Sequence, residues 1–326
     1  MSQEKRRALI CGVSGQDGSY LAQLLLNKGY EVWGSSRDAQ ISSFSGLHQL
    51  GIFDQVKTIS MSLIDFRSVL QGISKVQPHE IYNLAGQSSV GLSFEQPVET
   101  AESITNGVLN LLEAIRFLDK GIRFYNAGSS ECFGDTGGYF ADEETPMRPK
   151  SPYAIAKAAA TWQVTLYREA YGLLASTGIL FNHESPLRPA RFVTKKIVST
   201  ACRISLGSKE NLQLGNIDIR RDWGWAPEYV DAMWRMLTQD DPQDFVIATG
   251  VALSLREFLE AAFDCVGLNW ERHVMINTDL IRPSDPLEIK GLPLKAAKFL
   301  SWTPQIVGVE VVKKLVASEL AGLLSR

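Results

Sequence analysis

Residues 7–22 of the chain read RALICGVSGQDGSYLA, an apolar run that leads through a glycine-rich turn into a helical pattern. The glycines of this turn, Gly12, Gly15 and Gly18, follow a GxxGxxG spacing. In doubly wound folds the first such glycine permits a tight turn, the second lets a diphosphate approach the backbone, and the third lets the helix pack on the strand. The position directly after the first expected strand favours a dinucleotide site over a purely structural turn.

The same alternation of strand and helix continues along the first half of the chain. We expect further strands at residues 30–34, 81–84, 123–127 and 176–180, and helices at residues 19–28 and 107–116. Such alternation predicts a parallel sheet covered by helices. We expect ligand-binding loops at three proline-rich segments, residues 146–152, 186–189 and 282–293. The predicted fold is a Rossmann-type, doubly wound α/β sheet with a smaller C-terminal lobe.

The composition of the 326-residue chain is that of an ordinary globular protein. Hydrophobic residues make up 45% and charged residues 21% of the chain, and the formal net charge is −3. This charge provides no basic surface for nucleic acid or an anionic membrane, and no run of about 18 apolar residues predicts a membrane span. The N-terminal segment lacks the pattern of a signal peptide. The four cysteines and four histidines are scattered, so we expect a cytoplasmic protein without metal or disulfides.

A second signal lies in the string SPYAIAK, where four positions separate Tyr153 from Lys157. This spacing places both side chains on one face of a helix, one turn apart. We expect the Lys157 ammonium to lower the pKa of the Tyr153 phenol, which would make the tyrosine an acid–base group. Such pairs are also common on protein surfaces. However, Ser129 and Glu131 follow the expected strand at residues 123–127 and are predicted to face the same cleft.

The glycine turn, Ser129, Tyr153 and Lys157 together resemble the extended short-chain dehydrogenase/reductase family. Longer strings narrow the resemblance to the GDP-mannose 4,6-dehydratases: GVSGQDGSYLA (12–22), IYNLAGQSSV (81–90), GSSECFG (128–134), SPYAIAK (151–157), FNHESPLRP (181–189) and LGNIDIRRDWGWAPEYVDAMW (214–234). The resemblance covers nearly the whole chain. It implies an NADP-dependent nucleotide-sugar 4,6-dehydratase, a hydro-lyase that converts GDP-mannose to GDP-4-keto-6-deoxy-mannose by internal hydride transfer with loss of water.

The resemblance assigns the catalytic roles to Ser129, Glu131, Tyr153 and Lys157. In this chemistry Tyr153 removes the proton of the sugar 4-hydroxyl while hydride leaves C4, and Ser129 steadies the same oxygen. The resulting ketone acidifies the C5 hydrogen, so Glu131 removes it and assists loss of the 6-hydroxyl as water. Hydride then returns to C6. Because a plain dehydrogenase or epimerase needs no such carboxylate, Glu131 discriminates between these activities.

The expected cofactor is NADP, with NAD as the alternative. Arg37 follows the second expected strand and suits a 2′-phosphate, whereas a slip in register would place Asp38 against the ribose hydroxyls of NAD. The chain departs from the family pattern at Asp38, Ser62 and Glu99, where an arginine, an aspartate and a tyrosine are usual. The expected cofactor-binding residues are Gly12, Ser14, Gly15, Gln16, Asp17, Gly18, Arg37, Ser62, Leu63, Leu84, Ala85, Gln87, Tyr153, Lys157, His183 and Arg188.

The substrate is expected to be held mainly by residues of the second half of the chain, together with Ser88. Guanidinium groups bind a diphosphate bidentately, which favours Arg221 and Arg282, with Lys196 as a secondary candidate. Each of these cations is alternatively a solvated surface charge. Asp285 and Trp225 stand where the family shows a glutamate and a histidine. The expected substrate-binding residues are Ser88, Asn182, Lys196, Arg221, Arg282 and Asp285.

The resemblance also predicts how the chain is organised. Residues 1–181 and about 217–250 are expected to form the NAD(P)-binding Rossmann domain, and about 182–216 with 251–326 the nucleotide-sugar-binding lobe. A homodimer or homotetramer is expected, and segment 38–50 permits a contact between subunits.

Three other activities stay open. These are a GDP-4-keto-6-deoxy-mannose reductase, another nucleotide-sugar epimerase or dehydratase, and a cofactor-binding regulator without catalysis. The strings at residues 12–22 and 181–189 favour the dehydratase over the reductase. The presence of Tyr153 and Lys157 disfavours the regulator.

Overall fold

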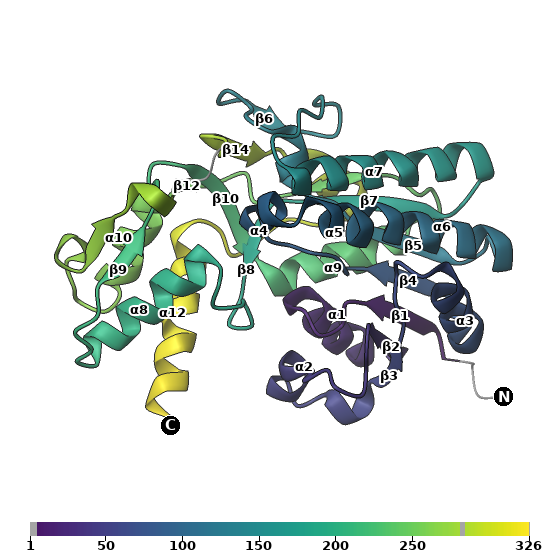
Figure 1. Ribbon diagram of the computed structural model, residues 1–326, viewed down its shortest axis with the longest axis horizontal. Coiled ribbons are helices and arrows are strands. Elements are labelled where there is room, and N and C mark those ends of the chain that lie inside the picture. Colours follow the sequence, from purple (N-terminus) through teal and green to yellow (C-terminus); the bar gives the residue numbers. More distant parts are fainter. Residues whose placement is uncertain (1–4, 281–283, 326) are drawn as a thin grey trace.

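A parallel sheet forms the centre of the computed structural model, which describes residues 5–280 and 284–325 (Figure 1). Its strands are β1 (Arg7–Cys11), β2 (Glu31–Ser36), β3 (Lys57–Ser60), β4 (Glu80–Asn83), β5 (Arg123–Ala127), β7 (Ala175–Leu180) and β11 (Phe245–Ile247). Within the described ranges these seven strands follow the order β11-β7-β5-β4-β1-β2-β3. Every neighbouring pair is parallel, and the order reverses at β1, which lies between β2 and β4. The predicted doubly wound sheet is confirmed.

Helices cover both faces of this sheet, as a sheet of buried parallel strands requires. On one face α1 (Gln16–Asn27), α2 (Ser45–Gln49), α9 (Ala226–Leu237) and α11 (Leu294–Leu300) share an apolar cluster with the strands. On the other face the cluster includes residues of α3 (Phe66–Val76), α6 (Gly107–Leu118) and α7 (Pro152–Tyr171). Two short helices, α4 (Val90–Glu95) and α5 (Pro97–Ala101), precede α6. Each fully buried Leu or Val contributes about 1.5–3 kcal/mol, so these two clusters fix the layers.

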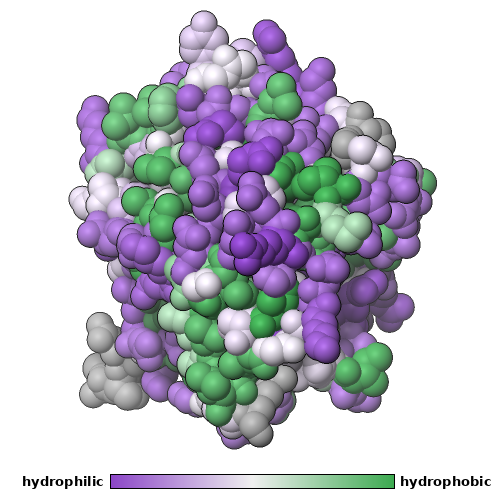
Figure 2. Space-filling view, turned by 90° about the vertical axis from the view of Figure 1, so that its left-hand side faces the viewer, coloured by the Kyte–Doolittle hydropathy of each residue, from purple (hydrophilic) through white to green (hydrophobic). Residues whose placement is uncertain are grey.

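A second group of elements forms the smaller lobe. Within the described residues its central sheet follows the order β12-β10-β14-β6, with β8 also paired to β10. Helices α8, α10 and α12 enclose a separate apolar cluster beside it. The outer face of this lobe mixes hydrophobic and hydrophilic side chains (Figure 2). Its elements are β6 (Phe140–Ala141), β8 (Asn182–Glu184), α8 (Val193–Ser205), β9 (Leu212–Leu214), β10 (Arg220–Trp225), β12 (Ala252–Ser254), α10 (Leu255–Asp264), β13 (Val274–Ile276), β14 (Glu288–Gly291) and α12 (Val309–Leu324).

The expectation that residues 282–293 form a loop throughout is wrong. Residues Glu288–Gly291 form β14, which pairs in parallel with β10 and with β6. The prolines on either side of this segment are a local signal, whereas its pairing partners lie far away in the sequence. Hydrogen bonds across the sheet therefore determine a strand that local composition conceals.

The long helix α7 begins and ends where its sequence dictates. Ser151 caps its N-terminus by accepting a hydrogen bond from the Ala154 amide at 3.1 Å, and Pro152 occupies the first turn. Gly172 ends the helix in a left-handed conformation with φ 71°. This start places Tyr153 and Lys157 on the buried face of the helix, while Ile155 lies exposed between them.

Among the described residues, no helix is both long enough and apolar enough to cross a membrane.

The turn between β1 and α1 is packed backbone against backbone. Gly12 has φ +84°, and a Cβ atom there would lie 2.9 Å from the amide nitrogen of Ala85, just beyond β4. A Cβ atom on Gly18 would lie 2.4 Å from the Gly12 carbonyl oxygen and 2.7 Å from the Val13 Cα. Gly15 is different, because its Cβ would meet the Gly12 oxygen at an ordinary 3.4 Å. Gly12 and Gly18 are thus required by packing, whereas Gly15 is not.

This difference predicts unequal effects of two alanine substitutions. Gly18→Ala should lower the free energy of unfolding by about 1–3 kcal/mol, because backbone atoms must move to admit the methyl group. Gly15→Ala, at the exposed N-cap of α1, should cost less than about 1 kcal/mol. Urea unfolding of both variants measures the difference, and equal losses would show that the turn relaxes around residue 18.

Candidate active site

A cavity of about 440 Å³ lies at the carboxyl edge of the large sheet and extends to residues of the smaller lobe. Its wall contains the four predicted catalytic residues Ser129, Glu131, Tyr153 and Lys157. Six of the predicted cofactor residues also line it, namely Asp17, Leu84, Tyr153, Lys157, His183 and Arg188. Five of the predicted substrate residues do so as well, namely Ser88, Asn182, Lys196, Arg221 and Asp285. Residues from widely separated parts of the chain therefore meet at one cavity.

Other predicted cofactor residues follow four adjacent strands at the same edge of the sheet. Gly12, Ser14 and Gly15 form the turn after β1, and Gln16 and Gly18 lie in the first turn of α1. Arg37 follows β2, Ser62 and Leu63 follow β3, and Ala85 and Gln87 follow β4. Arg37 is strongly exposed and lies 4.0 Å from the Glu99 carboxylate. The Gln87 side chain donates to the Ser89 carbonyl at 2.8 Å and to the Thr100 hydroxyl at 3.2 Å. Arg282 lies outside the described residues.

Tyr153, Lys157 and Ser129 are held together at the end of β5. The Lys157 ammonium donates a hydrogen bond to the Ala127 carbonyl oxygen at 2.7 Å, which ties α7 to this strand. Its nitrogen lies 5.9 Å from the centre of the Tyr153 ring. Ser129 hydrogen bonds with the Tyr153 phenol and also accepts from the Glu131 amide at 3.3 Å. All three side chains are at least nine-tenths buried.

Burial controls the ionisation of this group. It raises the pKa of the Tyr153 phenol above its usual value, and the hydrogen bond with Ser129 offsets part of that rise. Burial lowers the pKa of the Lys157 ammonium to about 8, against the influence of Cys132 and Asp17. The expectation of a lowered Tyr153 pKa is therefore wrong: the pKa is raised, because the loss of solvation by water outweighs the lowering effects of the hydrogen bond with Ser129 and of the Arg188 charge.

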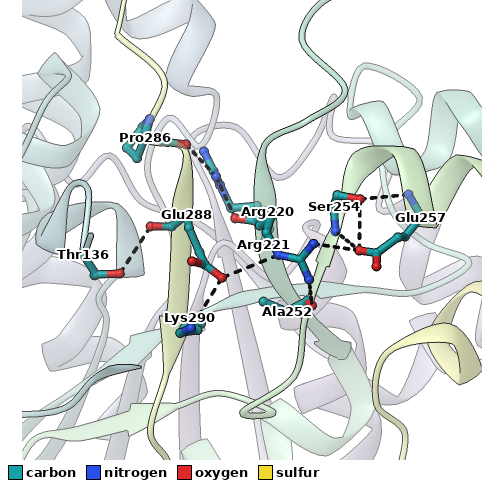
Figure 3. A network of polar contacts seen from close by, with 9 residues as sticks. All are labelled: Thr136, Arg220, Arg221, Ala252, Ser254, Glu257, Pro286, Glu288 and Lys290. Atoms are coloured by element: carbon teal, nitrogen blue, oxygen red, sulfur yellow. Dashed lines mark hydrogen bonds and ion pairs between the residues drawn. The ribbon is translucent and has the colours of Figure 1, made fainter. Parts of the chain in front are cut away.

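Glu131 belongs to a charged group formed with Arg221 and Asp285. The Arg221 Nε atom lies 4.0 Å from Glu131 Oε1, and its Nη2 atom donates to Asp285 Oδ1 at 2.6 Å. Arg221 Nη1 donates to the carbonyl oxygens of Pro286 at 2.8 Å and Arg220 at 2.9 Å (Figure 3). Arg221 is thus a buried guanidinium that holds β10, β14 and the Glu131 carboxylate in fixed positions.

A second ion pair joins the glycine turn to β8. His183 Nε2 lies 2.9 Å from Asp17 Oδ2, and His183 Nδ1 lies 2.7 Å from the Phe181 carbonyl oxygen. Burial lowers the pKa of His183, but Asp17 and the Phe181 carbonyl outweigh it, so the net pKa is raised. Burial likewise raises the pKa of Asp17, yet His183 outweighs that effect and lowers it. Gln16 reinforces the contact by donating to the His183 carbonyl oxygen at 3.2 Å.

Comparisons with known proteins place this geometry in a family. A family model described as GDP-mannose 4,6 dehydratase matches residues 9–315. The chain belongs to the GDP-mannose 4,6-dehydratase family. The GDP-mannose 4,6 dehydratase 1 of Arabidopsis thaliana is 44% identical over 97% of this chain and 90% of its own length. The human GDP-mannose 4,6 dehydratase is 41% identical over 98% of this chain and 93% of its own length.

A solved structure is also similar in fold. The UDP-glucose 4-epimerase of Thermus thermophilus, in complex with NAD, has a TM-score of 0.84 to this chain at 26% identity. The similarity covers 96% of this chain and 98% of the epimerase. The resemblance to extended short-chain dehydrogenases/reductases is confirmed.

Several residues that line the cavity were not predicted from the sequence. Arg191, Phe192 and Thr194 line it at the start of α8, and residues 213–216 line it at the end of β9 and just beyond. Glu184 also lines it, buried against Arg188 at 3.2 Å, and burial raises the pKa of its carboxyl group. A cation immediately before a helix start, as at Arg191, is the sequence signal that would have suggested an anion site.

The ion pair between Asp17 and His183 predicts a pH-dependent contribution to stability. Because the His183 pKa is raised, this contribution is complete below the ordinary histidine pKa of about 6.5 and is lost as the pH rises through the raised value. Because the Asp17 pKa is lowered, its contribution is present above the ordinary aspartate value and is lost as the pH falls through the lowered one. The window of full stabilisation lies between these limits.

Asp17→Asn should therefore lower the free energy of unfolding by about 1.5–3 kcal/mol at about pH 5.5, and by clearly less at about pH 9. Urea unfolding at both pH values measures this change. The exposed Asp54 supplies the control, because Asp54→Asn should have the same small effect at either pH. A loss for Asp17→Asn that does not depend on pH would contradict the pairing with a protonated His183.

Proposed function

We propose that this protein removes water from GDP-mannose to form GDP-4-keto-6-deoxy-mannose, with NADP as the bound cofactor. The observation that carries the proposal is the arrangement of Ser129, Glu131, Tyr153 and Lys157 around one cavity. Family membership identifies the sugar nucleotide as GDP-mannose, since the matched relatives are GDP-mannose 4,6-dehydratases.

The residues of the β1–α1 turn suit the diphosphate of such a cofactor. Gly15 is exposed at the N-cap of α1, and this end of the helix has no side-chain cap. Packing does not demand a glycine there, so the bare backbone leaves room for an anion to approach the helix amides. Lys157 would hold the nicotinamide ribose at the other end of the cavity. When bound, the cofactor would supply a hydride acceptor that takes hydride from C4 and returns it at C6.

Tyr153 and Ser129 are suited to the proton of the sugar 4-hydroxyl. The Tyr153 side chain, hydrogen bonded to Ser129, faces the cavity, and its deprotonated form, the phenolate, would accept this proton as the carbon is oxidised. The Ser129 hydroxyl would donate to the same oxygen and stabilise its developing charge. Lys157 lies one turn further along α7, where an ammonium favours the phenolate, although burial still keeps the net Tyr153 pKa above its usual value.

Glu131 is suited to the elimination step. Its carboxylate would remove the C5 proton, made acidic by the adjacent 4-ketone, and would pass a proton to the departing 6-hydroxyl. Arg221, 4.0 Å away, keeps the carboxylate in place, and Asp285 and Pro286 hold Arg221 in turn. The C5–H and C6–O bonds break, the C5–C6 double bond forms, and water leaves. As hydride is added at C6, C5 would regain one proton, which balances the proton taken by Tyr153.

The two lobes are proposed to divide the ligands between them. The Rossmann domain, residues 1–181 and about 217–250, would bind the cofactor, and the remaining segments the nucleotide sugar. The packing of α11 against α9 and β11 attaches this C-terminal segment to the Rossmann domain as well. The cofactor and the nucleotide sugar would thus bind to different lobes, and the two lobes would stay in contact.

A cytoplasmic homodimer or homotetramer is part of the proposal. Ile155, Trp162 and Leu166 lie on α7 and are 57%, 62% and 55% exposed. Their spacing along the helix places them on a single side, and an apolar strip of this kind favours association of two copies. In segment 38–50, by contrast, Phe44 and Leu47 are buried in the chain's own core. Light scattering on the purified protein determines the number of subunits.

The structure around Arg37 supports NADP over NAD. Arg37 is exposed just beyond β2, and Glu99 is 4.0 Å away, so its guanidinium is accessible to a phosphate. The Asp38 carboxylate instead accepts a hydrogen bond from the Gln40 amide at 2.8 Å, within its own turn. An aspartate engaged locally in this way is less suited to the ribose hydroxyls.

The function is tested directly by incubating the purified protein with GDP-mannose and NADP and following the sugar nucleotide by mass spectrometry. Loss of one water without accumulation of NADPH would establish the internal hydride cycle. Conversion only of a supplied 4-keto sugar with NADPH would show a reductase instead.

Two substitutions separate the catalytic steps. Tyr153→Phe should lower kcat about 10²–10⁴-fold with cofactor affinity unchanged, because the phenol acts on the proton alone. Glu131→Gln should abolish loss of water while leaving slow reduction of NADP by the sugar, measured as NADPH absorbance. Normal dehydration by Glu131→Gln would remove the residue from the mechanism.

Cofactor preference provides another prediction. Arg37→Gln should weaken NADP binding about tenfold and leave NAD binding unchanged, because a charged contact to the 2′-phosphate is lost. Titration by calorimetry measures both affinities. Asp38→Asn is the matched control, and a selective loss of NAD affinity in that variant would favour the NAD-binding alternative.

A further inference from the structure

Arg191 connects two walls of the cavity. It lies in the segment between β8 and α8, is exposed, and lines the cavity. Its Nη2 atom donates a hydrogen bond to the Ser88 hydroxyl at 3.2 Å. Ser88 belongs to the loop after β4 and also lines the cavity, so this contact joins a loop of the Rossmann sheet to the start of α8.

The cations of the cavity differ in how their charge is balanced. Three of them pair with carboxylates: His183 with Asp17 at 2.9 Å, Arg188 with Glu184 at 3.2 Å, and Arg221 with Asp285 at 2.6 Å. Arg191 and Lys196 instead donate to the Ser88 hydroxyl and, at 2.9 Å, to the Gln213 carbonyl oxygen. Among the ion pairs of residues 5–280 and 284–325, neither cation has a carboxylate partner. Their positive charge is therefore available to a ligand.

The first turn of α8 lies on the same wall. Phe192 is the N-cap, without a side-chain hydrogen bond to the helix, and Val193 and Thr194 line the cavity. The amide groups and dipole at the start of this 13-residue helix add positive potential between Arg191 and Lys196. The Phe192 ring contacts both neighbouring guanidiniums, with its centre 3.6 Å from Arg188 Cζ and 5.1 Å from Arg191 Cζ. This contact restrains Arg191 near the cavity.

Arg221 cannot serve an incoming anion as freely. Both of its Nη atoms already donate to the protein, to Asp285, Pro286 and Arg220, and its side chain is 5% exposed. If Arg221 turned to an incoming anion, it would lose its charge-assisted hydrogen bond to Asp285. If Arg191 turned to the anion, it would give up only its hydrogen bond to the neutral Ser88 hydroxyl. The bonds to the anion that replace it are about twice as strong.

We propose that Arg191 leaves Ser88 when the nucleotide sugar enters and binds its diphosphate, together with the start of α8 and Lys196. Arg191 thereby selects nucleoside diphosphates over monophosphates, and the released Ser88 hydroxyl becomes available to the sugar. The inference rests on the proposed function for the identity of the nucleotide sugar. A diphosphate is also present in the cofactor, so the two sources must be separated by experiment.

Calorimetry measures how GDP, GMP and NADP bind to the unmodified protein and to Arg191→Gln. The comparison distinguishes the diphosphate of the nucleotide sugar from that of the cofactor. GDP affinity should fall about tenfold, whereas GMP and NADP affinities should change less than about twofold. Arg191→Lys should retain part of the GDP affinity. The matched control is Arg203→Gln, in the last turn of α8 and paired with Glu210 at 2.8 Å, which should leave all three affinities unchanged.

Unchanged GDP affinity in Arg191→Gln would overturn the inference. An equal loss of NADP affinity would also overturn it, because Arg191 would then act on the cofactor or on the fold. The experiment gives a different result if GDP-mannose is not the substrate. If the unmodified protein binds UDP or dTDP in place of GDP, and Arg191→Gln weakens that binding about tenfold, the guanine assignment fails and the role of Arg191 stands.

Discussion

The parallel direction of the strands in the large sheet is the constraint on which the site depends. Parallel strands hydrogen bonded in one sheet all end at the same edge, so the segments that follow β1, β2, β3, β4 and β5 are brought together. The turn after β1, Arg37 beyond β2 and Ser129 beyond β5 share this edge for that reason alone. The steric demands at Gly12 and Gly18 then fix how closely α1 approaches the neighbouring strand end.

The polar contacts of the cavity attach the smaller lobe to this edge. Asp17 and His183 form an ion pair across 166 residues of sequence, and Gln16 also binds both the His183 carbonyl oxygen and Ser185. Ser185 donates to the Gln16 side chain at 2.8 Å. The same residues that begin α1 thus position β8, the strand that carries Asn182 and leads toward α8. These contacts directly connect the start of α1 to the wall of the cavity that β8 forms.

Charge within the cavity is divided between fixed and free groups. Arg221 and Asp285 form a buried pair that also faces Glu131, which suits a guanidinium whose task is to hold other groups still. Arg191 and Lys196 are exposed and contact neutral oxygen atoms. Tyr153 and Lys157 line the same cavity, where burial raises the pKa of the phenol and lowers that of the ammonium. The cavity thus combines a rigid, desolvated centre with an adaptable cationic wall.

The sequence by itself determined the doubly wound class, the glycine turn, the helix that carries Tyr153 and Lys157, and the family. The first three features depend on local patterns, namely apolar periodicity, glycine spacing and a residue spacing of one helical turn. The family follows from the resemblance of longer strings such as GVSGQDGSYLA and FNHESPLRP. The tertiary structure alone decided that Glu288–Gly291 is a strand, that Arg221 is occupied by Asp285, and that burial raises the Tyr153 pKa. It also brought Arg191 to the cavity opposite Ser88. Strand pairing, ion pairing and desolvation depend on neighbours distant in the chain, and a local pattern does not encode which neighbours those will be.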